Sequence, residues 1–213
     1  MKPVATGRRP LRPDEIGVFG GSCAVGDMIN DDVVTIEQAS WAGCGAADLN
    51  PYAFDWGVSP HIAAACAGAR IDIEHIAAAF DRLAGRVDAV VVEGTGGWLA
   101  PIGDSRTMAD VAQRLKLPVV LVVGLRLGCL NHALLSVQAI GASALTLAGW
   151  IGSVLSADMP ALAQNIATLD AMLSVPRLAL LPHARAADGD VDHVRHAADA
   201  LFAAQPRGDR GAK

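Results

Sequence analysis

Short runs of apolar residues alternate along the chain with longer segments in which apolar positions recur every three or four residues. The short runs are typical of strands in a buried sheet, and the longer segments are typical of helices with one apolar face. The predicted strands span residues 2–5 (the tail of a strand), 50–54 (a brief edge strand), 89–92, 118–123, 145–151 and 178–181. The predicted helices span residues 30–40, 59–67, 72–83, 107–115, 130–140 and 161–173. This alternation predicts an α/β fold in which helices cover both faces of a parallel sheet.

The pattern changes after Pro182, where the chain becomes polar and rich in Ala and Asp. One further helix is predicted at residues 191–204, followed by a frayed end. We therefore expect a single α/β domain over residues 1–183 and a polar C-terminal tail over residues 184–213. In sheets of this kind ligands bind outside the carboxyl ends of the strands, so polar residues at those ends are the candidates for function.

Composition and charge narrow the class of protein. The 213 residues are 52% apolar and 18% charged, which is enough for one hydrophobic core. A net charge of −5 argues against nucleic acid as a main partner, because binding to phosphates requires a basic surface. The four cysteines are far apart, no apolar run is long enough to span a membrane, and the N-terminus lacks a signal peptide's apolar segment. We expect a soluble cytoplasmic protein with reduced thiols and no membrane partner.

The run VVVEGTGG at residues 90–97 places an acid, Glu93, at the carboxyl end of a predicted buried strand. A carboxylate in that position is costly unless it is paired or binds a ligand. The glycines that follow it allow backbone N–H groups to approach an anion closely. The run therefore favours an Mg²⁺ ion that bridges Glu93 to phosphate oxygens. The alternative is a tight turn with Glu93 solvated at its mouth.

Three further segments carry polar groups where a ligand is expected. Asp31 and Asp32 lie at the start of a predicted helix, where one is expected to act as the N-cap and the other could bind a metal. Lys2 is predicted to end its strand at the same sheet edge, where its ammonium would meet phosphate or carbamate charge unless it is an ordinary surface lysine. In LGCLNH, at residues 127–132, Asn131 could cap the next helix, whose free N–H groups could receive a carboxylate.

Taken in order, several segments resemble one family, the dethiobiotin synthetases, which are ATP-dependent enzymes of biotin biosynthesis. The matching segments are KPVATG (residues 2–7), NDD (30–32), NPYAF (50–54), SPHIAA (59–64), VVVEGTGGWLAPI (90–102), PVVLVVGLRLGCLNHALLSVQAI (118–140) and LAGWI (147–151). The resemblance implies a three-layer parallel sheet of the P-loop NTPase type and a cytoplasmic homodimer. It also implies the substrates 7,8-diaminononanoate, CO₂ or bicarbonate, and Mg·ATP. Their product would be dethiobiotin, formed through a carbamate that the γ-phosphate activates for ring closure.

The resemblance also assigns roles around the nucleotide. Lys2 would be the catalytic residue that stabilises the γ-phosphate and the carbamate. Asp32 and Glu93 would bind Mg²⁺ and contact ATP. The residues whose backbone would line the phosphates are Gly94, Thr95 and Gly96. Pro182 would border the adenine, while Ser153 stands where the family usually has an Asn that recognises the base, which leaves the nucleotide preference open.

For the diamine substrate, the resemblance implies two contact regions. Thr6 stands where the family usually has a substrate-contacting Ser, and it keeps the hydroxyl. A helix N-terminus would receive the substrate carboxylate across the homodimer, and its residues are Gly128, Cys129, Leu130 and Asn131.

Family members carry a strand, a P-loop and a helix before the segment that matches KPVATG, whereas here Met1 directly precedes Lys2. The resemblance therefore implies that the first strand and the P-loop are missing from this chain. We expect that Met1 is an internal methionine of a longer protein and that the chain as written is impaired in turnover and folding. Two other functions stay open. One is a non-catalytic, dimerising paralogue that binds substrate without using ATP, and the other is a related ATP-dependent ligase of the cobyrinate-amidation type.

Overall fold

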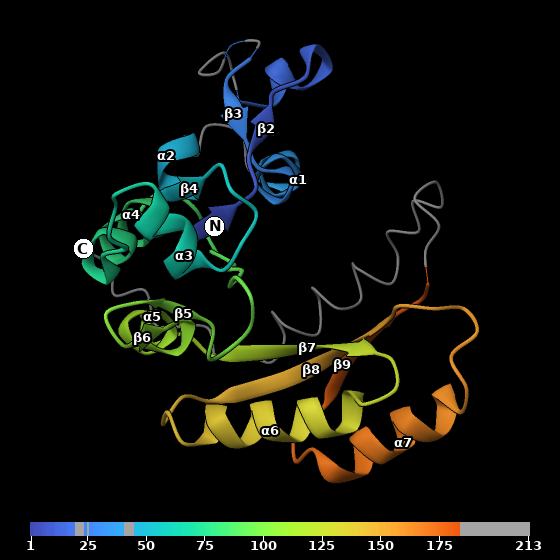
Figure 1. The fold of residues 1–213 in the computed structure, drawn as a ribbon. Coiled ribbons are helices and arrows are strands. Elements are labelled where there is room, and N and C mark those ends of the chain that lie inside the picture. The colour runs from blue at the N-terminus through green and yellow to red at the C-terminus, as the bar shows by residue number, and fades with distance from the viewer. Residues whose placement is uncertain (20–23, 25, 41–44, 184–213) are drawn as a thin grey trace. The chain divides into compact units, whose positions relative to one another are not determined.

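A computed structural model describes residues 1–19, 24, 26–40 and 45–183. The helix predicted at residues 191–204 and the tail lie outside the described residues. The chain divides into two compact units, Met1–Lys116 and Leu117–Lys213. Both units contain parallel strands and helices (Figure 1), which confirms the α/β class. Among the helices of the described ranges, none is both long and apolar enough to cross a membrane.

In the first unit, the strand β1 (Val4–Thr6) pairs in parallel with β4 (Tyr52–Phe54). A parallel pair requires a crossover connection between its strands. The crossover contains β2 (Arg9–Pro10), the 3-10 helix η1 (Pro13–Phe19), β3 (Met28–Ile29), α1 (Asp31–Ala39) and α2 (Ala46–Leu49). The edge strand predicted at residues 50–54 is confirmed.

The strand predicted at residues 2–5 is shifted, because β1 begins at Val4. Pro3 has no N–H with which to extend the ladder, although its carbonyl accepts a bond from Tyr52 at 3.2 Å. Lys2 instead donates its N–H to Leu49 at 2.7 Å. The prediction that Lys2 ends a strand is therefore wrong, since Lys2 precedes the strand.

The start of α1 also differs from the prediction. Asn30 has the extended backbone of an N-cap, and its side-chain oxygen accepts the N–H of Asp32 at 3.0 Å. Asp31 and Asp32 are already helical, so neither acid is the cap. Both carboxylates are consequently available for other partners.

The other helices of the first unit begin as their capping residues predict. α3 (Pro60–Cys66) has Pro at its first position, α4 (Ile73–Ala84) is capped by Asp72, and α5 (Met108–Leu115) follows the capping box of Thr107 and Asp110. A short antiparallel hairpin of β5 (Pro101–Gly103) and β6 (Arg106–Thr107) precedes α5. The sequence did not reveal this hairpin.

The prediction of a strand at residues 89–92 is wrong. Among the described residues this segment is not part of any sheet, and it pairs with Met1, whose amino group donates to the carbonyl of Val91 at 2.7 Å. The N–H of Glu93 returns a bond of 2.9 Å to the Met1 carbonyl. Two bonds to one residue do not extend into a ladder, so the apolar run forms no strand.

In the second unit, three parallel strands lie in the order β7 (Val119–Leu125), β8 (Leu147–Val154) and β9 (Arg177–Leu181). The crossover helices α6 (Cys129–Gly141) and α7 (Leu162–Met172) lie on the same face of this sheet (Figure 1). Their apolar sides pack on Trp150 and Leu125, both of which are fully buried. All the strands and helices predicted beyond residue 117 are confirmed up to Leu181, with shifts of a few residues at their ends.

Candidate functional site

Lys2 is the centre of the predicted metal and phosphate site in the first unit. Its Nζ lies 2.7 Å from Oε1 of Glu93 and 2.8 Å from Oδ2 of Asp32, and it donates a longer bond of 3.4 Å to the carbonyl of Gly94. The lysine side chain is only 6% exposed, whereas the carboxylates are 54% and 55% exposed. A buried ammonium therefore joins two carboxylates that face solvent. The alternative of an ordinary surface lysine is wrong.

The surroundings of Lys2 fix its charge. Burial alone would lower the pKa of the ammonium, but hydrogen bonds and charges from Asp32 and Glu93 outweigh burial and raise that pKa. The stabilisation that the charged ammonium gains from these partners is lost as the pH rises through the raised pKa of Lys2. Lys2 therefore stays protonated across the neutral range. It can neutralise anionic oxygens, but it cannot act as a general base near neutral pH.

The glycine-rich turn after Glu93 is tied to the first strand. The hydroxyl of Thr95 donates to the carbonyl of Val4. Gly96 and Gly97 have φ values of +76° and +105°, and a Cβ on Gly96 would lie 3.1 Å from Cβ of Ala100. These two positions therefore require glycine.

Gly94 is less constrained than the two glycines that follow it. A Cβ at Gly94 would make only an ordinary contact of 3.7 Å with Met108. The part of the turn that requires glycine is thus residues 96–97.

The NDD segment forms a set of contacts that the sequence did not reveal. The Asn30 amide donates to the carbonyl of Thr6 at 2.9 Å, and the Asp31 carboxylate accepts a bond of 2.7 Å from Nε of Arg9. Asp32 pairs with Lys2. No spacing rule connects residues 2–9 with residues 30–32, so only the three-dimensional pairing shows these partners.

The remaining predicted residues lie in the second unit, at the carboxyl edge of its sheet. Gly128, with φ of +93°, is the N-cap of α6, so the prediction that Asn131 caps this helix is wrong. Cys129 is buried and Asn131 is exposed in the first turn, where N–H groups have no acceptor within the helix. Ser153 is in register with Leu181, and Pro182 directly follows. Ser153 and Pro182 therefore end neighbouring strands.

The donors at Lys2 suit a magnesium ion better than a transition metal. Asp32 and Glu93 supply two carboxylates that already share one cation, the Lys2 ammonium. Within the described ranges, no cluster of three or more His, Cys, Asp and Glu residues could hold a metal by protein ligands alone. Mg²⁺ is usually bound by one or two carboxylates together with substrate phosphates and water, so this donor set fits it.

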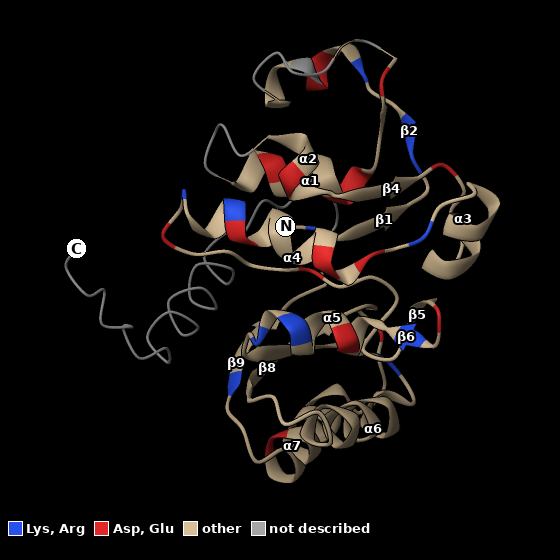
Figure 2. Ribbon diagram, turned by 90° about the vertical axis from the view of Figure 1, so that its left-hand side faces the viewer, with Lys and Arg blue, Asp and Glu red and all other residues tan. Residues whose placement is uncertain are grey.

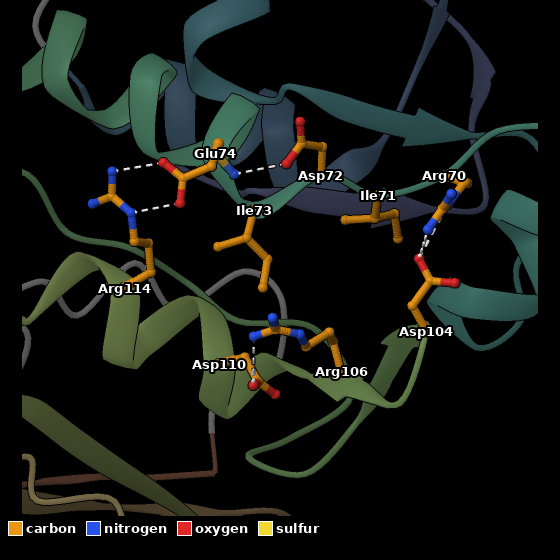
Figure 3. A pocket seen from close by; sticks show the side chains of 9 residues that line it. All are labelled: Arg70, Ile71, Asp72, Ile73, Glu74, Asp104, Arg106, Asp110 and Arg114. Carbon is orange, nitrogen blue, oxygen red and sulfur yellow. Dashed lines mark hydrogen bonds and ion pairs between the residues drawn. The ribbon is translucent and has the colours of Figure 1, made fainter.

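A cavity of about 680 Å³ lies elsewhere in the first unit, between the start of α4, the β5–β6 hairpin and α5 (Figure 3). It is lined by charged side chains that already bind one another (Figure 3). The pairs are Arg70 with Asp104, Arg106 with Asp110, and Arg114 with Glu74. The residues that line this cavity include no glycine at which the backbone could approach a phosphate closely, so the cavity is a poorer site for phosphate than the turn beside Lys2. The carboxylates at Lys2 remain the better candidate.

Comparison with known proteins defines the class and then the family. A family model described as an AAA domain matches residues 1–190, which places the chain among ATP-using α/β domains. The chain is 43% identical over 188 residues to the ATP-dependent dethiobiotin synthetase BioD of Aromatoleum aromaticum, covering 88% of this chain and 78% of that protein. It is 44% identical over 172 residues to the enzyme of the same name from Ralstonia nicotianae, covering 81% and 74%. The chain belongs to the dethiobiotin synthetase family.

Proposed function

We propose that the protein acts as an ATP-dependent dethiobiotin synthetase, a ligase of biotin biosynthesis. The observation that carries this function to the chain itself is the buried Lys2 ammonium that joins Asp32 and Glu93 beside a glycine turn. A protein that only bound the diamine would have no use for two solvent-facing carboxylates held on one cation. The non-catalytic alternative is therefore not favoured.

Under this proposal, Asp32 and Glu93 hold Mg²⁺. When bound, Mg²⁺ would neutralise charge on the phosphate oxygens of ATP. Lys2 supplies a fixed positive charge to the γ-phosphate and the carbamate, as phosphoryl transfer requires. Backbone groups of the turn would line the phosphates, at Gly94, Thr95 and Gly96.

The proposed reaction joins CO₂ to one amine of 7,8-diaminononanoate as a carbamate. The γ-phosphoryl group of ATP then passes to a carbamate oxygen, which releases ADP and forms a mixed anhydride. The second amine attacks the carbonyl carbon, and phosphate leaves as the ureido ring closes. The Thr6 hydroxyl would contact the diamine, while the N-terminal turn of α6, from Gly128 to Asn131, would receive its carboxylate. Ser153 and Pro182 would contact the base of the nucleotide.

We also propose that the protein is a homodimer that uses α6 as a main contact. This helix contains no Lys, Arg, Asp or Glu and is tan throughout in Figure 2. Leu127, just before it, is 95% exposed, and Leu135 within it is 54% exposed. Exposed apolar side chains on an uncharged helix favour burial against another protein surface. Sedimentation should give twice the chain mass of 21.9 kDa, and a monomer at micromolar concentration would contradict the proposal.

The function is tested by product formation. The protein purified from its own cells, supplied with Mg·ATP, bicarbonate and 7,8-diaminononanoate, should release dethiobiotin, ADP and phosphate in equal amounts, as measured by mass spectrometry and a phosphate assay. Omission of the diamine should abolish the phosphate release. Tight binding of the diamine with no product at any ATP concentration would instead support the non-catalytic alternative.

A further inference from the structure

Three consecutive residues at the start of α1 bind three different points of the segment formed by residues 2–9. Asn30 donates to the carbonyls of Thr6 and Gly7, at 2.9 and 3.4 Å. Asp31 accepts from Arg9, and Asp32 pairs with Lys2. Successive residues of a helix point about 100° apart, which lets the two neighbouring acids reach different cations.

Arg9 is itself held from the opposite side. Its Nη1 and Nη2 donate to the two carboxylate oxygens of Glu15, at 2.8 and 2.6 Å, while its Nε donates to Asp31 at 2.7 Å. Glu15 also accepts the N–H of Arg12 at 2.9 Å, and its side chain is only 9% exposed. The planar guanidinium thus bridges a buried carboxylate to an exposed one, a geometry that a lysine cannot reproduce.

The Arg9–Glu15 pair forms a rigid anchor for the first turn of α1. Hydrogen bonds from Arg9 and from the Arg12 N–H lower the pKa of Glu15 to about 2, so that Glu15 stays ionised at neutral pH. β2 also pairs Arg9 with Ile29, the residue before the N-cap Asn30. The position of Arg9 relative to the helix start is therefore fixed by both backbone and side chain.

We propose that Arg9 is a positioning residue of the synthetase. By binding Asp31, Arg9 fixes the first turn of α1. Asp32 is then the acid of that turn that serves the metal site beside Lys2. This inference rests on the proposed role of Asp32 in binding Mg·ATP. Without Arg9, Asp31 becomes a second free carboxylate beside Asp32, and the anchor of the helix start is lost.

The test measures Mn²⁺·ATP binding by the enhancement of water-proton relaxation, which does not depend on turnover. Arg9→Ala and Asp31→Ala should each weaken binding about tenfold, the size typical of residues that orient a metal ligand. The double variant should be no weaker than the single ones, because both substitutions remove the same link. The matched control is Arg8→Ala, whose exposed pair with Asp55 does not touch α1, and it should stay within about twofold of wild type.

The outcomes separate this inference from the proposed function. If the losses of Mn²⁺·ATP affinity in the two single variants multiply in the double variant, the positioning role is overturned, because Arg9 would then act on the nucleotide directly. If Glu93→Gln weakens binding while Arg9→Ala and Asp31→Ala do not, only the positioning role falls. If wild type fails to bind Mn²⁺·ATP, the role and the metal site fall together. Should Arg9→Ala not fold, as judged by circular dichroism, Asp31→Ala decides alone, because it leaves the Arg9–Glu15 pair intact.

Discussion

Among the buried acids of the first unit, Glu37 differs from Glu15 because no guanidinium group of the described residues binds it, and the charge of the Met1 amino group only partly opposes the effect of burial on its pKa. Glu37 is 7% exposed, and its Oε2 has no hydrogen-bond partner among the described residues. Burial raises its pKa above the ordinary value of 4.5. The folded protein therefore binds this proton more tightly than the unfolded chain does. Its ionisation weakens folding as the pH rises from about 4.5 through the raised pKa.

The variant Glu37→Gln should consequently be more stable than wild type at about pH 8, with a difference that shrinks towards about pH 4.5. Urea unfolding at both pH values measures this. The control Glu74→Gln should instead be less stable than wild type at both pH values, because the hydrogen bond from Arg114 lowers the pKa of Glu74, and the stabilisation from that pair is lost only as the pH falls through the lowered pKa. An unchanged Glu37→Gln curve at both pH values would contradict the account.

Among single residues, the sequence predicted the acidic residues of the candidate site better than the groups that bind them. Glu93 could be found because a lone carboxylate interrupts an apolar run before glycines, whereas Asp32 could be chosen over Asp31 only through the resemblance of NDD to the family. The burial of Lys2 and the anchor at Arg9 could not be predicted. They depend on contacts across as many as 91 positions of sequence, which local patterns do not report.

At the level of the elements, the pairing of β8 with β9 leaves no room for a side chain at Gly149. A Cβ on Gly149 would lie 2.7 Å from Cγ of Leu178 and 2.8 Å from the carbonyl oxygen of Pro176. That carbonyl cannot easily move, because it accepts the N–H of Trp150 at 3.0 Å. A side chain at Gly149 must therefore displace either the neighbouring strand or a buried leucine.

Gly149→Ala should lower the free energy of unfolding by about 1–3 kcal/mol, as overpacking of a core does. The matched control is Gly141→Ala at the end of α6, where an added Cβ meets nothing within 4 Å. Chemical denaturation of both variants measures the difference. Equal stability of the two variants would show that the strand spacing around Gly149 is looser than described.

Helices could be predicted from sequence more reliably than strands. Asp72 and Ser59-Pro60 signal helix starts through chemistry that is local in the chain, and α4 and α3 begin there. The run at residues 89–92 has the composition of a buried strand, yet a strand also requires a partner ladder, and the segment pairs only with Met1. The β5–β6 hairpin was missed because it is short and has no alternating apolar pattern.

At the scale of the whole molecule, the α/β class followed from the sequence because strand and helix alternate without interruption from β7 to β9. The division at Lys116 and Leu117 did not follow, since no change of composition marks it. The residues that were predicted for function from the sequence are divided between the two units. Lys2, Asp32 and Glu93 lie in the first unit, while Gly128, Ser153 and Pro182 lie in the second.

We propose above that the Lys2 ammonium, held by Asp32 and Glu93, is the positive charge that this synthetase uses on its anionic substrates. The most direct measurement is kcat for dethiobiotin formation by Lys2→Met, which keeps an apolar stem of similar length, beside the exposed control Lys116→Met. The account predicts that Lys2→Met loses about 10²–10³-fold in kcat, as enzymes do when one charge-stabilising group is removed, while Lys116→Met matches wild type. A folded Lys2→Met protein with the kcat of wild type would contradict it.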